Sequence, residues 1–113
     1  MSDRLVLPEE GPPVTPGVAR DVIGDAFSHG ATTVVIPVER LDPAFFDLRT
    51  GVAGDVVQAF ATYRLRLIVV GPLPPLATTS SSFAAFVAEA NRGTQTRFVD
   101  RLDEPEPRNP AVG

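Results

Sequence analysis

The chain of 113 residues contains no cysteine, no lysine and a single histidine, His29. Without cysteine it has no disulfide framework, no thiolate nucleophile and no cysteine-based zinc or iron–sulfur site. One histidine excludes a histidine-rich metal site. Without lysine, neither a Schiff base nor the lysine of the common phosphate-binding loop is available. We therefore expect no metal and no cofactor, and we lean towards a protein that is not an enzyme.

Positive charge and long apolar runs are also scarce. The net charge of −4 argues against a nucleic-acid-binding face, which needs a basic surface. No apolar run reaches the roughly 18 residues that a membrane span requires, and the N-terminus lacks the layout of a signal peptide. We expect a soluble, cytoplasmic protein. Hydrophobic residues make up 43% of the chain, which is ordinary for one small globular domain with a real core.

Hydrophobic periodicity and the placing of Pro and Gly predict that strands alternate with helices. The predicted strands are an edge strand (4–7), a β-branched strand (32–38), a strand at 65–70 and a last strand at 94–99. The predicted helices lie between Thr15 and Gly30, from Thr50-Gly51 onward, and from a serine of 80–82 to a stop at Asn91-Arg92-Gly93. A short turn from Asp42 and a loop (71–82) complete the chain. We interpret that stop as a left-handed Asn or Gly. The Phe residues at helical spacing are assigned to the core.

This alternation predicts one α/β domain over residues 1–102, with about four mostly parallel strands and three main helices. Residues 103–113 (DEPEPRNPAVG) form an acidic, Pro-rich tail that we expect to be disordered.

Ligands of such sheets usually bind at the carboxyl ends of the strands. Most of the interesting polar and glycine residues follow the predicted strand 32–38, so the candidate site for a ligand or partner lies at that edge. Its residues are Glu39, Arg40, Arg49, Thr50, Gly51 and Gly54.

The Arg49-Thr50-Gly51 segment has two interpretations. In the functional one, the helix start, a nearby glycine and an arginine bind a phosphate or carboxylate, or the Thr50 hydroxyl is itself phosphorylated. In the structural one, Thr50 caps the helix, Gly51 and Gly54 allow close packing on the sheet, and Arg49 is solvated. We favour the structural interpretation, because a G-x-x-G spacing is shorter than any dinucleotide-binding pattern.

Other catalytic arrangements are weaker. Glu39, Asp47 and Asp55 are acids for which nothing fixes a paired geometry, and His29 in the last turn of a helix suits the helix dipole better than catalysis. The serine run 80–82 lacks the G-x-S-x-G turn of hydrolases.

The segments VVIPVERLDPAFFDLRTGVAGDVVQAFATYRLRLIVVG and FVAEANRG, with a weaker ARDVIGDAF, resemble a bacterial domain of unknown function, number 4180. The family typically has Lys at Ala59, Asn at Thr62 and Asp at Pro72, and these departures weaken any claim that polar groups at these three positions are essential in this chain. The pattern is similar to STAS-like domains, small α/β modules that act as anti-sigma-factor antagonists and transporter regulatory domains. In those modules a Ser or Thr at the corresponding helix start is a phosphorylated switch, and Thr50 occupies roughly that place.

The function we expect is therefore a non-enzymatic STAS-like regulatory or protein-interaction module. It would bind an unknown protein partner, and it could form a homodimer through apolar surface at the short edge strand. The alternative is a binder of a phosphorylated or carboxylate metabolite, or a weak enzyme, that uses the helix N-terminus at Thr50-Gly51.

Overall fold

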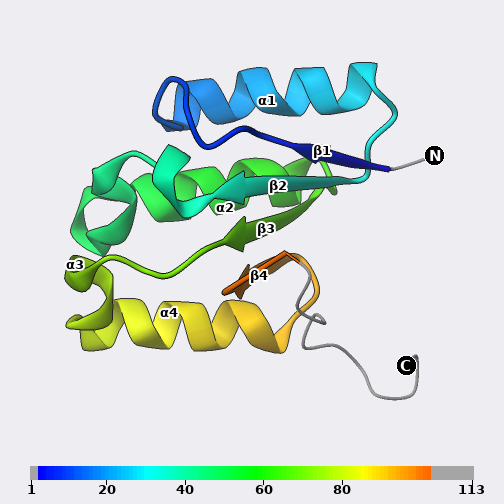
Figure 1. Cartoon of the computed structure of the whole chain (residues 1–113). Coiled ribbons are helices and arrows are strands. Elements are labelled where there is room, and N and C mark those ends of the chain that lie inside the picture. Colours follow the sequence, from blue (N-terminus) through cyan, green and yellow to red (C-terminus); the bar gives the residue numbers. More distant parts are fainter. Residues whose placement is uncertain (1–2, 103–113) are drawn as a thin grey trace.

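The computed structural model describes residues 3–102, which form a single α/β domain (Figure 1). Four strands, β1 (Arg4–Val6), β2 (Thr33–Pro37), β3 (Arg66–Val70) and β4 (Thr96–Val99), make one sheet in the order β1-β2-β3-β4. Every neighbouring pair is parallel. The prediction of one α/β domain with about four mostly parallel strands and three main helices is therefore confirmed, with β1 at an edge as expected, whereas the likeness to STAS domains stays a prediction. The tail predicted to be disordered, 103–113, lies outside the described residues.

Three long helices connect the strands: α1 (Pro16–Ser28), α2 (Val52–Thr62) and α4 (Ser81–Arg92). Thr15 caps α1 by accepting from the Val18 amide, and Ser80 caps α4 by accepting from the Phe83 amide. The predicted loop 71–82 is wrong in part, because it contains a one-turn helix, α3 (Pro75–Thr78), that begins at a proline suited to the first helical position.

The end of α4 also differs from the prediction. The helix stops at Arg92 as expected, but neither Asn91 nor Gly93 is left-handed, and Gly93 has φ −95°. The Asn91 side chain instead pairs with the backbone of the edge strand β4. Its amide donates to the Phe98 carbonyl (3.3 Å), and its oxygen accepts from the Phe98 N–H (2.8 Å). The Asn91 side chain thus takes the place of a neighbouring strand at Phe98, where it pairs the N–H and the carbonyl on the outer edge of β4.

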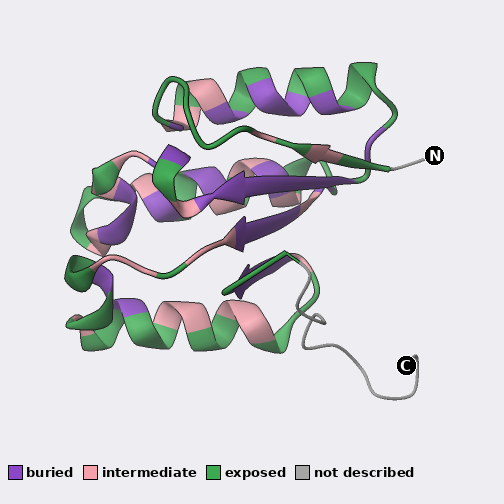
Figure 2. Cartoon of the chain, in the orientation of Figure 1, coloured by how far each residue is buried: buried purple, intermediate pink, exposed green. Residues whose placement is uncertain are grey.

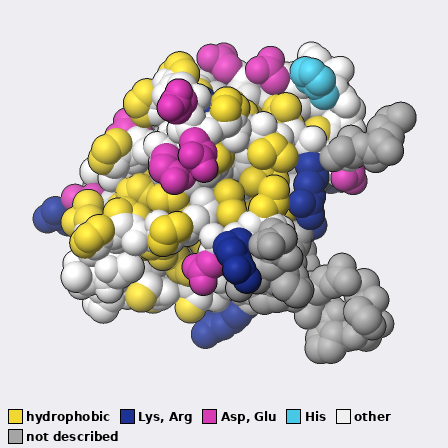
Figure 3. Space-filling model, viewed as in Figure 1, with side chains coloured by type: hydrophobic (Ala, Val, Ile, Leu, Met, Phe, Trp, Pro, Cys, Tyr) yellow, Lys and Arg dark blue, Asp and Glu magenta, His cyan; other side chains and the backbone are white. Residues whose placement is uncertain are grey.

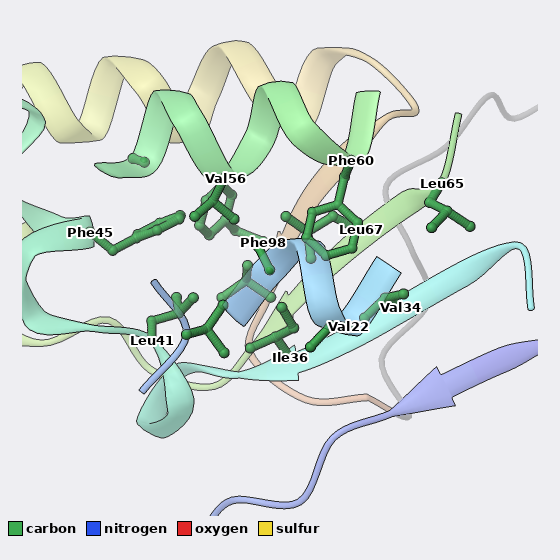
Figure 4. Close-up of a cluster of buried hydrophobic side chains, with 14 of the residues drawn as sticks. Val22, Val34, Ile36, Leu41, Phe45, Val56, Phe60, Leu65, Leu67 and Phe98 are labelled. Carbon is green, nitrogen blue, oxygen red and sulfur yellow. The ribbon is translucent and has the colours of Figure 1, made fainter. Parts of the chain in front are cut away.

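The main core lies between the helices and one face of the sheet (Figure 4). From the strands come Val34, Ile36, Leu67, Val69 and Phe98, and against them pack residues of all three long helices, such as Val22, Val56, Phe60 and Phe83. The short 3-10 helix η2 (Pro43–Phe46) adds Phe45 and Phe46. The prediction that the helical Phe residues are core is wrong for Phe27, which is 53% exposed and forms an edge-to-face pair with the half-exposed Tyr63.

All three long helices therefore cover the same face of the sheet. This follows from the topology, because strands laid down in sequence with crossovers of one hand place every helix on one side. The opposite face carries a separate small cluster of Val35, Ile68 and Val99, with Val70 beside it. We call this face the helix-free face, since no described helix packs on it. Figure 2 shows that β2 and β3 are buried almost along their whole length.

Candidate functional site

The carboxyl ends of the strands meet at one edge, where the chain makes three short 3-10 helices between β2 and α2 (Figure 1). These are η1 (Val38–Arg40), η2 and η3 (Leu48–Thr50). All six predicted site residues belong to this connection or to the first turn of α2. The structure therefore places them at the expected edge, but it does not bring them into one site.

Arg40 points inward. It is 7% exposed, and its guanidinium donates to three backbone carbonyls of the loop that follows β1. Nε donates to Pro12 (3.0 Å), and Nη1 donates to Pro8 (3.0 Å) and Glu10 (3.4 Å). Arg40 thus fastens the loop before α1 to the end of β2, and its charge is directed into the protein.

Arg49 forms a salt bridge with Asp47. The two side chains form a bidentate pair, with Nε to Oδ1 at 3.0 Å and Nη2 to Oδ2 at 2.9 Å. Asp47 Oδ1 also accepts from the Arg49 amide at 3.1 Å, which caps η3. These hydrogen bonds from Arg49 lower the pKa of Asp47 below its ordinary value, and the carboxylate raises the pKa of Arg49. The pair lies at the surface, where the Arg49 side chain is 90% exposed, and its arginine already binds one carboxylate.

The Thr50 hydroxyl is held on three sides although the residue is exposed. It lies 2.7 Å from the Ala44 carbonyl and 2.8 Å from the Asp47 carbonyl, and it accepts from the Val52 amide at 3.2 Å. The N-cap residue of α2 is Gly51, so the interpretation of Thr50 as the cap is wrong, although the Thr50 hydroxyl accepts from the first amide of the helix. Gly51 follows with φ +80°, a conformation that strongly favours glycine, and its N–H donates to the Leu48 carbonyl.

Gly54 and Glu39 lie apart from this turn. An added Cβ at Gly54 would meet nothing within 4 Å, so the interpretation that Gly54 permits close packing on the sheet is wrong. The same holds for Gly51, which is needed for its backbone conformation. Glu39 is exposed and lines a hollow of about 450 Å³ on the side of the helix-free face, together with Pro37, Val70 and Leu102.

A second hollow, of about 310 Å³, lies on the helix side of the same edge. Asp47, Arg49, Leu76 and Ser80 are among its lining residues, and it shares none with the hollow at Glu39. The candidate residues are thus divided between a buried anchor, an exposed turn and two separate hollows. Within residues 3–102 no group of three or more His, Cys, Asp or Glu side chains could hold a metal ion, and no helix is long and apolar enough to cross a membrane.

Sequence reasoning missed the most definite interaction at this edge, the Asp47–Arg49 pair. A signal was present, because an acid two residues before an arginine, next to a threonine and a glycine, is a common way to fix a tight turn before a helix. The role of Arg40 had no such signal. Its partners are backbone carbonyls about 30 residues earlier in the chain, and every residue has such a carbonyl, so the sequence does not show which of them Arg40 binds.

The comparisons with known proteins agree with the resemblance seen in the sequence. Residues 3–108 match the model of a family described as Domain of unknown function (DUF4180), and the chain therefore belongs to this family. Searches of curated proteins and of solved structures found no match.

Proposed function

We propose that this DUF4180 protein is a non-enzymatic regulatory or protein-interaction domain whose contact surface is the turn 47–51. The supporting observation is that Arg49, Thr50 and Gly51 are exposed while their polar neighbours are already bonded within the turn. Hydrogen bonds within the turn restrict its conformation before binding, and this reduces the conformational entropy that is lost when a partner covers it. An exposed, ordered turn is therefore well suited to recognition by another protein.

The arrangement favours a protein partner over a small anion. A phosphate or carboxylate metabolite bound here would lie beside the Asp47 carboxylate, which already accepts two hydrogen bonds from Arg49 and would repel it, and the α2 amide of Val52 already has Thr50 as its acceptor. The two hollows at this edge do not converge on Thr50 or Gly51. The metabolite-binding alternative is thus the less well supported of the two functions.

The same turn offers a mechanism of regulation through Thr50. Phosphorylation replaces the hydroxyl proton, so Thr50 could no longer donate to the Ala44 or Asp47 carbonyls. It would also place about two negative charges next to Asp47. The turn would have to rebuild, with Arg49 and the N-terminus of α2 as the nearest groups able to accept the new charge. Modification at this position would change the surface presented to a partner, as the resemblance to STAS-like modules implies.

The test compares affinity capture of partner proteins by the wild type, Thr50→Asp, Thr50→Ala and Thr50→Ser. Serine keeps the hydroxyl and is the matched control, so it should recover the same proteins as the wild type. Thr50→Asp should lose or gain a partner. Each variant is first checked for folding by its melting temperature. Recovery of the same proteins by all four would remove the basis for the switch.

The metabolite alternative has its own measurement. A ligand at a hundred times its dissociation constant stabilises the protein by about 2.7 kcal/mol, which a thermal shift detects readily. We expect no shift with inorganic phosphate or simple carboxylates. A shift that disappears in Arg49→Ala would favour the ligand-binding function instead.

A further inference from the structure

A third hollow, of about 340 Å³, lies between α2 and α4 beside the start of β4. Val57 of α2 and Phe86 and Ala90 of α4 form apolar walls, and Thr96 of β4 lies at its floor. Space remains beside the end of α4 because Ala90 has a short side chain and Gly93 has none. An added Cβ at Gly93 would meet only the Ala90 carbonyl oxygen, at 3.8 Å. Ligand pockets are mostly apolar and have volumes of about 300–1,000 Å³, so the hollow has the size of a small-ligand site.

Thr96 supplies the polar group of this hollow. In the register of the sheet it lies opposite Leu67, which belongs to the main core, so the Thr96 side chain points to the helix side. Thr96 is 3% exposed, and its hydroxyl has no hydrogen-bond partner among the described residues. Such a group is destabilising, and water would satisfy it poorly here, because a buried water needs about two to four polar partners. A ligand with a hydrogen-bonding group could pair with the hydroxyl after at most a rotation about the Cα–Cβ bond.

Exposed apolar side chains alone would not identify a ligand site, since apolar atoms form much of every protein surface. Figure 3 shows hydrophobic side chains gathered across the middle of the face in view. The hollow between α2 and α4 differs from such a surface because it has a wall on each side and an unpartnered hydroxyl at its floor. A molecule bound there would gain a hydrogen bond in addition to apolar contacts.

The charges around the hollow narrow the class of ligand. Among the described residues that line it, only Glu89 is charged, and its exposed carboxylate lies 2.7 Å from Nη1 of Arg92. Arg66 is also close, since its Nε donates to the Thr94 carbonyl at 2.9 Å, but neither arginine lines the hollow. A bound anion would therefore lie beside the Glu89 carboxylate and be repelled by it. The surroundings favour a neutral molecule.

We propose that this hollow binds a neutral, largely apolar small molecule with one hydrogen-bonding group, which pairs with the Thr96 hydroxyl. Since a water molecule occupies about 30 Å³ of the liquid, there is room for roughly a dozen non-hydrogen atoms. The hollow shares no lining residue with the two hollows at the carboxyl edge. The inference therefore does not depend on the function proposed for the turn 47–51.

Three naphthalene derivatives substituted at the same ring position test the proposal: naphthol, methylnaphthalene and naphthoate. The methyl NMR signals of Val57 and Ala90 report binding, and those of Val22 on α1 serve as the reference. We expect saturable shifts of Val57 and Ala90 with naphthol and weaker binding of naphthoate. In Thr96→Val, which keeps the shape but removes the hydroxyl, the affinity for naphthol relative to methylnaphthalene should fall about three- to tenfold. Thr94→Val makes the same change at the exposed rim and should leave this ratio unchanged.

Filling the hollow gives a second test. Ala90→Leu should abolish binding of both naphthol and methylnaphthalene, whereas Ala88→Leu, at an exposed position of the same helix, should preserve it. The melting temperature of each variant verifies folding, and that of Thr96→Val should rise by several degrees, because the unpartnered hydroxyl is gone. Thr96→Val decides the question even where Ala90→Leu lowers stability.

Four results would overturn the proposal: no saturable shift with naphthol, an unchanged affinity ratio in Thr96→Val, tighter binding of naphthoate than of naphthol, or binding that survives in a folded Ala90→Leu variant. A fifth is a shift of the Val57 and Ala90 signals that depends on protein concentration without any probe. In that case a second copy of the chain, rather than a small molecule, would fill the hollow.

Discussion

Arg40 offers the sharpest test of how the carboxyl edge is built. Its guanidinium donates to the carbonyls of Pro8, Pro12 and, more weakly, Glu10, and it packs against Gly11. A Cβ at Gly11 would lie 2.8 Å from Arg40 Cζ, which is closer than such atoms approach. Gly11 also has φ +147°, a conformation that is essentially restricted to glycine. The loop and the arginine therefore hold each other in place.

Removal of the Arg40 side chain should lower the free energy of unfolding substantially. A hydrogen bond to a charged group contributes about 1.5–3 kcal/mol, and water can partly replace the donor because the loop residues are exposed. For Arg40→Ala we expect a loss of about 2–4 kcal/mol in the free energy of unfolding, out of a total that is typically 5–15 kcal/mol. Arg40→Lys should recover only part of this loss, because an ammonium cannot reproduce the planar fork that reaches two carbonyls at once.

A double-mutant cycle with Gly11→Ala isolates the contact from the backbone strain. Alone, Gly11→Ala should cost about 1–3 kcal/mol for the unfavourable φ, plus the clash with the guanidinium. In the Arg40→Ala background the clash is gone and only the strain remains, so the cost should fall by about 1 kcal/mol. Denaturant unfolding of the four proteins measures this coupling. If the two effects add to within about 0.5 kcal/mol, the guanidinium is not held against Gly11 and the reasoning is wrong.

Three further changes probe the same framework. Gly54→Ala should stabilise the protein by about 0.5–1 kcal/mol in thermal unfolding, because the position is helical and nothing lies within 4 Å of an added Cβ; a loss of stability would show an unseen close contact. Asn91→Ala should cost about 1–3 kcal/mol and speed hydrogen exchange at the Phe98 amide, which loses its acceptor; unchanged exchange there would contradict the pairing. Since Arg49 lowers the pKa of Asp47, this group stabilises the folded state above its unfolded pKa of about 3.9 and ceases to do so as the pH falls through its lower folded pKa. Arg49→Ala should therefore move the Asp47 pKa up towards its ordinary value in an NMR titration, and no movement would refute the pair.

Most of the fold could be predicted because its signals are local. Caps such as Thr15 and Ser80, β-branched strands and glycines after helices all act within a few residues, and alternation then dictates a parallel sheet. The errors occur where distant contacts override local preference. Asn91 does not take a left-handed conformation, because its side chain bonds the backbone of β4.

The sequence predicted where in the fold the candidate residues lie, but it did not predict the directions in which their side chains point. The alternation of strands and helices placed Glu39, Arg40 and Thr50 near one edge, and they are there. Whether a side chain points outward or inward depends on partners that the local pattern does not contain. Arg40 turns inward because three carbonyls of a separate loop lie under it, and Glu39 remains outside although it is the adjacent residue.

The strand order explains why this edge forms no single cleft. In α/β sheets that bind ligands, the crevice opens where the strand order reverses and neighbouring crossovers leave for opposite faces. The order β1-β2-β3-β4 has no reversal, and all long helices lie on one side. The connections therefore follow one another along the edge and fill it with short helices, so that its exposed part is a raised turn. The same topology leaves the other face of the sheet without helices. Within residues 3–102 the carboxyl edge therefore presents the exposed turn 47–51 rather than a crevice between crossovers.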